Sequence, residues 1–464
     1  MTEQEYAAIA AAGDRLLCAQ DTSLARLAIP PLHVINEHPG CTSVYDPAAR
    51  RLADWEDFPR AALRAARAVV RSARRGREAS GTRAPIDVLI ISHLVNPTQL
   101  EQTDDLYFGP LQQLLTDNGA TSLLAFVNHL RFEPQGSSIL PKHAPPAVEA
   151  QLWLQSFKER NALRALARAT HDPIALLASR HAWLEPTVAN LRLHRSIAEL
   201  CQAHSPKIVL TTYEGEACER IIWHAARSNG AKPLCVGYQH ARVLPRAHAI
   251  RRSLGLDCDP DVVLTSAQSS HAALAGSPGL AAVKFIRYGS HRTAPAAQRP
   301  SSHKREICLV LPDAAPAECA LLLEFASACA KQLPAVTFEL RPHPATEVRA
   351  MPANVMLSTG GASLAEACSE ASWCLYRGSS AVVQAVMAGV RPFYLQQPDE
   401  MSFDPLAGLS GWREMVASPE DFVARRQIPG KPGEWQAAVD FCQQHTSLLE
   451  PAAVTQLLNM VRNA

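Results

Sequence analysis

At 464 residues the chain is too long for one hydrophobic core, and we expect it to fold into two or three domains. Hydrophobic residues make up 47% and charged residues 19%, which excludes a disordered or solvating protein. The net charge of +1 excludes a molecule that is basic all over, so no nucleic-acid partner is expected.

The cysteines and the first residues bear on the compartment. The 12 cysteines form no C-x-x-C pair and mostly stand in apolar runs, the pattern of free thiols in a reducing cytosol. The N-terminal residues lack the basic start and apolar stretch of a signal peptide, and no apolar run approaches the roughly 20 residues that span a bilayer. We therefore expect a cytoplasmic protein, with contact at the inner face of the membrane left open.

Residues 1–80 read as a helical N-terminal extension. Thr2 is a candidate N-cap for an alanine-rich helix, and residues 58–80 combine helical spacing of apolar residues with an arginine-rich face. Such a basic face is usually solvated, although it also suits an anionic membrane or glycan.

Residues 81–292 read as a first Rossmann-like domain. Short apolar runs predict parallel strands, and a long helical stretch at 146–204 separates the second from the third. The predicted strands are 86–93, 121–129, 207–212, 233–237 and 261–265, with a helix at 217–228.

A change of composition at 291–305 predicts a linker, because alanine, proline and serine alternate there with scattered charge. A second Rossmann-like domain follows at 306–434. Its predicted strands are 307–311, 336–340, 354–357, 373–376 and 392–395, with helices at 317–332 and 381–388. Residues 435–464 predict a helical tail that packs back on the first domain.

The alternation of strands and helices predicts the α/β class, with two doubly wound parallel sheets facing a central cleft. Ligands of such sheets bind at the loops that follow the carboxyl ends of the strands. Those loops therefore hold the candidate site residues.

The first candidate is the run RPHP after the strand at 336–340. Arg341 is always charged and His343 donates hydrogen bonds, so the pair suits a phosphate oxygen, while Pro344 stiffens the turn. The alternative is an ordinary surface turn.

The second candidate is the turn after the strand at 373–376. Gly378, Ser379 and Ser380 lead into a helix, where backbone N–H groups, hydroxyls and the helix dipole favour an anion. Serine is also a common N-cap without any ligand. We expect the two candidates to lie on adjacent strand ends and to grip one phosphate.

The third candidate is the acidic turn after the strand at 207–212. Glu214 and Glu216 stand beside a glycine, where a carboxylate can deprotonate an acceptor hydroxyl or attack a sugar. Glu216 can instead belong to the first turn of the next helix.

Other polar residues at the strand ends of the first domain are candidates for binding the sugar or the acceptor. They are Tyr213, Gln239, His240, His93 and Asp104, with satisfied loop contacts as the alternative. No metal is expected, because the histidines lack ligand spacing and Asp257-Cys258-Asp259 lies outside a clear strand. P-loop and dinucleotide fingerprints are absent too, so no cofactor is expected.

The runs RPHP and YRGSS, with the apolar helix that closes in AGVRPFYL, resemble the donor-binding half of GT-B glycosyltransferases. The likeness is to bacterial sialyltransferases, polysialyltransferases and Kdo transferases, whose HP and serine motifs bind the phosphate of CMP. The resemblance implies this role for His343, Pro344, Ser379 and Ser380. Tyr213-Glu214-Gly215 matches only part of the acidic-acidic-glycine motif that supplies the base in the sialyltransferases.

The resemblance implies a glycosyltransferase that moves an acidic sugar, Kdo or another nonulosonate, from a CMP donor to a surface-glycan acceptor that is lipid-linked or free. The alternatives are a UDP-sugar or CDP-glycerol transferase, a sugar epimerase, and a non-catalytic nucleotide- or sugar-binding component of polysaccharide assembly. Whether Glu214 acts as base or nucleophile stays open.

Overall fold

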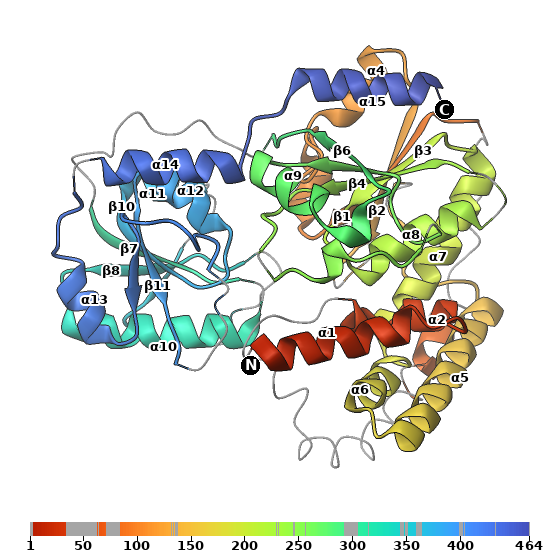
Figure 1. Ribbon diagram of the computed structural model, residues 1–464, viewed down its shortest axis with the longest axis horizontal. Helices are drawn as coiled ribbons and strands as arrows, with labels where there is room; N and C mark the ends of the chain where they lie inside the picture. Colours follow the sequence, from red (N-terminus) through yellow and green to blue (C-terminus); the bar gives the residue numbers. More distant parts are fainter. Residues whose placement is uncertain are drawn as a thin grey trace.

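The computed structural model describes residues 3–33, 63, 65–70, 84–130, 132, 134, 138–228, 230, 232–244, 246–255, 257–291, 305–313, 315–343, 348, 351–358, 364–398, 402, 404–431 and 433–463. Within them lie two six-stranded parallel sheets with helices around them (Figure 1). The predicted class, two doubly wound α/β domains, is confirmed.

The first sheet has the order β2-β1-β3-β4-β5-β6. Its central strands are buried on both faces because helices cover the two sides, which explains their continuous apolar runs. The strands are β1 Val88–Leu94, β2 Ser122–Asn128, β3 Ile208–Thr212, β4 Leu234–Gln239, β5 Val262–Thr265 and β6 Lys284–Arg287. Helices α4 Leu111–Asp117, α7 Glu185–His204, α8 Ala217–Arg227 and α9 Gln268–Ala275 belong to this domain.

The second sheet has the order β12-β11-β10-β7-β8-β9. The chain therefore builds outward from β7 in one direction and then returns to its other side at β10. The strands are β7 Arg305–Leu311, β8 Thr337–Leu340, β9 Met356–Leu357, β10 Ala371–Tyr376, β11 Arg391–Leu395 and β12 Glu414–Val416. The helices are α10 Pro316–Gln332, α11 Leu364–Glu370, α12 Ala381–Met387, α13 Pro419–Arg425 and α14 Glu434–His445.

Two short edge strands, β6 and β12, were not predicted. β6 has one buried residue among its four and β12 has one among its three, so neither shows the apolar run of a central strand. The helical stretch predicted at 146–204 is divided into three helices. Asp172 caps the second through its contact with the backbone N–H of Ile174, and a proline stands near the start of each helix.

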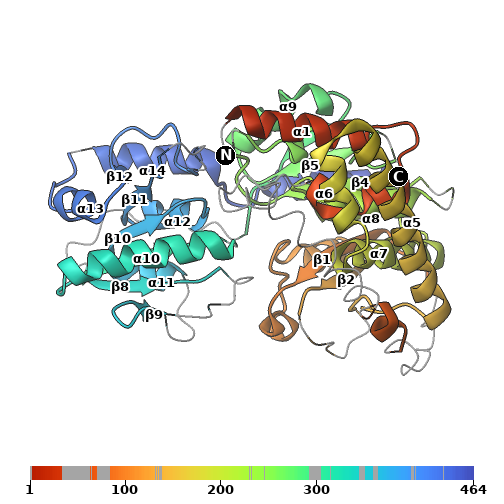
Figure 2. The same cartoon turned by 90° about the horizontal axis from the view of Figure 1, so that it is seen from below.

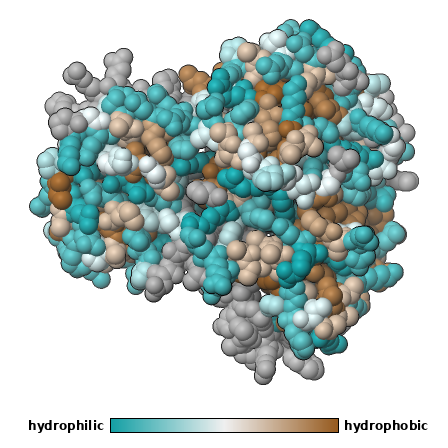
Figure 3. Space-filling model, in the orientation of Figure 1, coloured by the Kyte–Doolittle hydropathy of each residue, from teal (hydrophilic) through white to brown (hydrophobic). Residues whose placement is uncertain are grey.

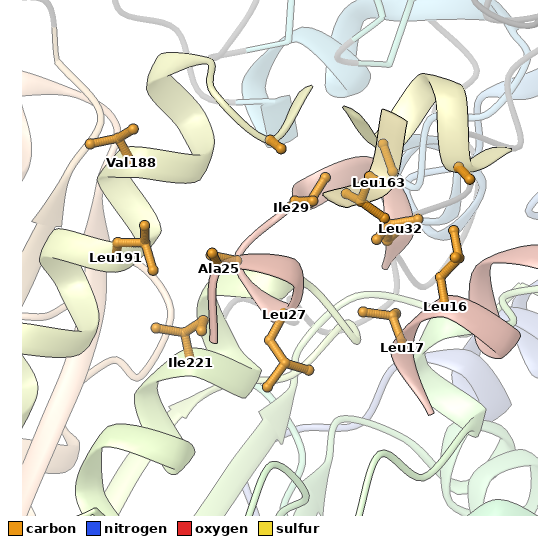
Figure 4. Close-up of a cluster of buried hydrophobic side chains, with 14 of the residues drawn as sticks. Leu16, Leu17, Ala25, Leu27, Ile29, Leu32, Leu163, Val188, Leu191 and Ile221 are labelled. Atoms are coloured by element: carbon orange, nitrogen blue, oxygen red, sulfur yellow. The ribbon is translucent and has the colours of Figure 1, made fainter. Parts of the chain in front are cut away.

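Helices from the N-terminal end and from the middle of the chain form a separate apolar core (Figure 4). α1 Glu3–Leu17 and α2 Leu24–Leu27 contribute Leu16, Leu17 and Leu27, which pack near Leu163 of α5 Pro146–Thr170. α6 Pro173–His181 and the 3-10 turn Pro30–Leu32 complete this layer. Its buried Arg26 is held by Glu159 at 2.7 Å. Further 3-10 turns lie at Pro97–Glu101, Ala249–Arg251 and Pro278–Leu280.

The last two helices belong to different domains. α14 packs on α12 in the second domain, through buried Ala438 and Cys442. α15 Pro451–Asn463 lies in the core of the first domain, where Leu457 packs with Leu210 and other strand residues. The chain thus crosses between the domains after α14, and Figure 2 shows the two domains on either side of that junction.

Three expectations fall outside the described residues: the N-cap at Thr2, most of the helix at 58–80, and the linker at 291–305 except its ends. Among the helices that are described, none is long and apolar enough to cross a membrane. The face drawn in Figure 3 is mostly hydrophilic, with hydrophobic residues in separate patches.

Two facing histidines of α7 and α8 make stability depend on pH. Nε2 of His194 and Nδ1 of His224 are 2.9 Å apart, so when both rings are neutral one ring donates its N–H to the nitrogen of the other. Burial, together with a smaller effect of the neighbouring ring, lowers the pKa of His194 to about 4, and burial also lowers the pKa of His224. Below about pH 6.5 these histidines bind protons in the unfolded chain but not in the folded chain. Their contribution to the free energy of unfolding is therefore fully present above about pH 6.5 and is lost as the pH falls toward 4.

We expect the free energy of unfolding to fall by about 2 kcal/mol over that interval through this pair. Urea unfolding at a series of pH values checks the slope. His194→Gln should flatten it, whereas His343→Gln, at an exposed position, serves as the control. An unchanged slope in His194→Gln would contradict this assignment.

Candidate active site at the carboxyl edges of the two sheets

Loops that follow strands of both sheets meet where the domains join. Arg246, after β4, donates to the carbonyl oxygen of Ser402, after β11, at 3.3 Å. Ser269 of α9 lies 2.5 Å from Nδ1 of His445 at the end of α14. The strand orders reverse between β1 and β3 in one sheet and between β7 and β10 in the other. Such reversals are where open α/β sheets bind ligands, so the loops after these strands form the candidate site.

The turn after β3 carries Glu214 and Glu216, and both side chains are exposed. Gly215 between them has a φ of +87°, and a Cβ there would collide with the carbonyl group of Ala249. Tyr213 lies beneath the turn, where its buried hydroxyl donates to the carbonyl oxygen of Ile250 at 2.8 Å. Tyr213 therefore anchors the turn from below.

A buried carboxylate holds the turn from inside. Glu219 accepts hydrogen bonds from the backbone N–H groups of Glu214, Gly215 and Glu216, at 2.8–2.9 Å. It also accepts one from the hydroxyl of Thr212 at 3.1 Å. Burial and the charges of Glu216 and Glu214 raise the pKa of Glu219, against the effect of the backbone donors. Because Glu219 occupies the amide groups at the start of α8, these amides are not available to a ligand.

Glu216 has the properties of a general base or acid at neutral pH. Solvent reaches its side chain, but the surrounding protein removes much of the water that would stabilise its charge. This desolvation and the charge of Glu214 raise the pKa of Glu216 to about 7. The thiol of Cys218 donates to Glu216 at 3.4 Å, and burial raises the pKa of that thiol, so it stays protonated. A carboxyl group that titrates near neutrality is suited to proton transfer.

Glu214 lies beside His240, which follows β4. An oxygen of Glu214 is 3.7 Å from Nε2 of His240, whose ring makes an edge contact with Tyr107 at 4.9 Å between centroids. Three loops of the first sheet thus bring a carboxylate, an imidazole and a phenol together. These groups can donate to and accept from sugar hydroxyls.

Beneath these residues runs a chain of buried hydrogen bonds. His93, at the end of β1, contacts His129 through Nδ1 and Thr212 through Nε2, both at 2.9 Å. Thr212 continues the chain to Glu219. Burial, together with smaller effects of the neighbouring histidines, lowers the pKa of His93 to about 3, so the ring is neutral. His93 is therefore part of the support of the site, at a level below the exposed carboxylates.

Two further predicted residues do not join this group through any contact that the structure gives. Gln239 is fully buried, and its oxygen lies 3.3 Å from the backbone N–H of Ser266. Asp104 is exposed, whereas the adjacent Asp105 is buried and accepts from Ser92 at 2.7 Å and from the N–H groups of Tyr107 and Phe108. Asp105 thereby orients the loop that presents Tyr107.

In the second domain, Arg341 and His343 follow β8. Arg341 is half-buried and donates to the hydroxyl of Ser358 at 3.0 Å, while His343 is exposed. Pro344, the remaining residue of this motif, lies outside the described residues.

The turn after β10 holds Gly378, Ser379 and Ser380. Ser379 is buried, whereas Ser380 is exposed and stands at the start of α12 without capping it through its side chain. The preceding Arg377 is buried and pairs with Glu318 of α10 at 2.5 Å. Arg377 is thus an internal support of the turn.

The expectation that these two motifs occupy adjacent strands is wrong. β8 and β10 lie on opposite sides of β7, and the register places Arg341 and Tyr376 on either side of Leu311. Both motifs share the carboxyl edge, but their strands are about 10 Å apart, twice the usual spacing. The loop of Asp313 lies between them, so side chains of both motifs must reach across that loop to hold one phosphate.

In the parts of the chain with assigned positions, no group of three or more histidine, cysteine, aspartate or glutamate residues is placed to hold a metal ion.

No protein-family model matches the chain, and no curated protein matches its sequence. Solved structures of similar fold include the glycosyltransferase SnogD from Streptomyces nogalater, with 17% identity over 81% of this chain and 100% of that one, at a TM-score of 0.44. The UDP-GlcNAc 2-epimerase from Methanocaldococcus jannaschii has 9% identity over 82% and 100% of the two chains, at a TM-score of 0.47. The UDP-GlcNAc 2-epimerase from Neisseria meningitidis has 12% identity over 82% of this chain and 100% of that one, at a TM-score of 0.45. Similarity at this level assigns neither an activity nor a substrate.

Four residues of this arrangement were not selected from the sequence: Tyr107, His129, Thr212 and Glu219. A signal existed for Glu219, because Glu216 and Glu219 have the spacing of a capping box at the start of a helix. His129 ends a predicted strand, as the selected residues do. Tyr107 gave no signal, since its place depends on how Asp105 folds the loop.

Proposed function

We propose that the chain is a glycosyltransferase of GT-B type that transfers an acidic sugar, Kdo or another nonulosonate, from a CMP donor to a surface-glycan acceptor. The observation that carries the proposal is Glu216, an exposed carboxylate at the carboxyl edge of one sheet whose pKa is raised to about 7. The other sheet presents Arg341, His343 and the Ser379-Ser380 turn at its own carboxyl edge.

In this scheme Glu216 is the general base. It takes the proton of the acceptor hydroxyl while the acceptor oxygen bonds to the anomeric carbon of the sugar. The bond from that carbon to the phosphate oxygen breaks, and CMP leaves with the electron pair. Glu214 and His240, with Tyr107 beside them, orient the acceptor through hydrogen bonds.

The second domain stabilises the leaving group. Arg341 and His343 contribute hydrogen-bond donors on one side of β7, and the Gly378–Ser380 turn contributes on the other. A phosphate monoester accumulates charge as it leaves, and donors at fixed positions stabilise that charge in the transition state. The proposed scheme uses no metal ion.

Nucleotide binding tests the donor assignment. We expect CMP to raise the melting temperature more than CDP, UDP or GDP at equal concentration, because a ligand that binds only the folded chain stabilises it. His343→Ala should reduce the shift with CMP and lower kcat with a CMP-sugar by about 10²-fold, as for the loss of one oxyanion contact. Thermal shift and a donor-hydrolysis assay provide the two measurements.

The same experiments separate the alternatives. If UDP raises the melting temperature more than CMP does, the donor is a UDP-sugar. A larger rise with CDP would favour a CDP-glycerol transferase. Binding of CMP without hydrolysis or transfer would indicate a non-catalytic component. Normal turnover by His343→Ala would remove that residue from the phosphate site.

A further inference from the structure

Arg242 stands in the loop after β4, where the first domain meets the second. Its guanidinium carbon lies 5.4 Å from the centroid of the Phe441 ring on α14, in a cation–π contact. Tyr376 at the end of β10 and Asp404 after β11 are close enough to act on it electrostatically. The side chain thus points from the carboxyl edge of the first sheet toward that of the second.

This guanidinium lacks the partners that a cation normally has inside a protein. Its Nε and Nη1 atoms are inaccessible to water and have no hydrogen-bond partner in the described chain. Burial lowers the pKa of Arg242, although an arginine keeps its charge at any physiological pH. Buried donors without partners are rare and destabilising, and they often mark the place of an absent ligand, ion or water.

The contrast with the other buried arginines is sharp. Six arginines are buried in the described part of the chain, and each has a carboxylate partner. The pairs are Arg26–Glu159, Arg192–Glu149, Arg220–Asp259, Arg252–Asp14, Arg377–Glu318 and Arg391–Glu414. Arg242 is half-buried and has no such pair among the described residues, so none of their carboxylates neutralises its charge directly.

The groups that face Arg242 do not neutralise it. Asp404 accepts hydrogen bonds from Tyr376 at 2.7 Å and from the N–H of Leu406 at 2.8 Å, and it pairs with Arg413. His445 is neutral, because burial and the charge of Arg242 together lower its pKa to about 4. The carboxylate that acts on Arg242 electrostatically is therefore already balanced by another arginine.

We propose that Arg242 binds the phosphate of the nucleotide donor from the first domain, opposite the donors of the second domain. This inference rests on the proposed function and adds to it a contact that ties donor binding to the junction of the domains. A guanidinium donates to phosphate oxygens through several N–H groups, and in Arg242 the Nε and Nη1 donors have no partner in the described chain. Phe441 fixes the plane of the guanidinium in advance.

The test compares a nucleotide with its nucleoside. Isothermal titration measures the Kd of CMP and of cytidine for the full-length wild type and for Arg242→Met. We expect Arg242→Met to raise the Kd of CMP by about 10- to 100-fold, because a hydrogen-bonded charge pair is lost, and to leave the Kd of cytidine unchanged. Arg242→Lys keeps the charge without the paired donors and should fall between the two.

Arg246→Met is the matched control. Arg246 lies in the same loop and makes the interdomain hydrogen bond to Ser402, so its loss loosens the junction while Arg242 keeps its place. If Arg246→Met weakens CMP binding as strongly as Arg242→Met does, the contact between the domains explains the effect, and the assignment of Arg242 to the phosphate is wrong. It is also wrong if CMP and cytidine weaken equally, or if CMP affinity does not change.

A change confined to the KM of the CMP-sugar would assign Arg242 to the carboxylate of the sugar and overturn the phosphate contact. The titrations also distinguish a wrong donor assignment from a wrong role of Arg242. If the wild type binds UDP in place of CMP, the comparison of UDP with uridine tests Arg242 in the same way. If it binds no nucleotide, the proposed function and this inference both fail.

Discussion

Glu216→Gln is expected to lower kcat by about 10²- to 10⁴-fold, while the affinity for CMP stays the same. The amide has nearly the size of the carboxylate and accepts the Cys218 contact through its oxygen, but it cannot take a proton from the acceptor hydroxyl. Glu219 holds the turn through backbone N–H groups, so the substitution should leave the backbone in place. Steady-state kinetics with a CMP-sugar, together with the melting temperature as a folding control, provide the measurement.

The pH dependence identifies the role. A general base must be deprotonated, so kcat/KM of the wild type should rise with pH through about 7, the value to which the pKa of Glu216 is raised. The rise of kcat/KM with pH, the limb of the profile near pH 7, should be absent in Glu216→Gln. Glu214→Gln is the matched variant, because it removes the neighbouring charge that helps to raise the pKa and should move the limb to lower pH. If Glu214→Gln abolishes turnover and Glu216→Gln retains both rate and limb, the base is Glu214.

Arg377→Met is expected to lower the free energy of unfolding of the second domain by about 3–5 kcal/mol. The substitution leaves the carboxylate of Glu318 buried without its partner, where both side chains of the pair are almost fully removed from water. The guanidinium also donates to the carbonyl oxygen of Leu395 at 3.2 Å, which would lose that partner. Urea unfolding, monitored for the transition of this domain, measures the loss.

Two comparisons make this prediction specific. The double variant Arg377→Met/Glu318→Leu removes both charges and should recover most of the stability, because the cost lies in the unpaired charge. Arg305→Met breaks an ion pair of the same domain, with Glu370 at 3.1 Å, in which both side chains are largely exposed. That loss should stay below about 1 kcal/mol. Equal effects of Arg377→Met and Arg305→Met would contradict the internal role of Arg377.

The central strands could be predicted because burial on both faces demands a continuous apolar run. Val88–Leu94, Ile208–Thr212 and Trp373–Tyr376 have such runs, and each was predicted to within a few residues. β6 and β12 were missed because an edge strand keeps polar residues and is short. The order of the strands leaves no local trace, so the placement of β7 between the two predicted phosphate-binding motifs could not be foreseen.

The candidate site was predictable to the level of the loop. Polar residues after parallel strands gather at one edge, which explains why Glu214, Glu216 and His240 were selected from the sequence alone. Burial separated residues that the sequence treats alike. Tyr213 and Glu214 are neighbours in one turn, yet the phenol lies beneath the turn and the carboxylate is exposed.

The sequence by itself determined the α/β class of this protein, its central strands and the loops that carry polar groups, because backbone periodicity and burial act over a few residues. Only the tertiary structure decided which of those groups are exposed, which are paired and which are charged. Glu216 and Glu219 differ in role because one faces solvent and the other fills the turn. Arg377 and Arg242 differ because Glu318 pairs with the first, whereas no carboxylate of the described residues pairs with the second. Such distinctions depend on groups that are distant in the chain, and long-range packing alone brings those groups together.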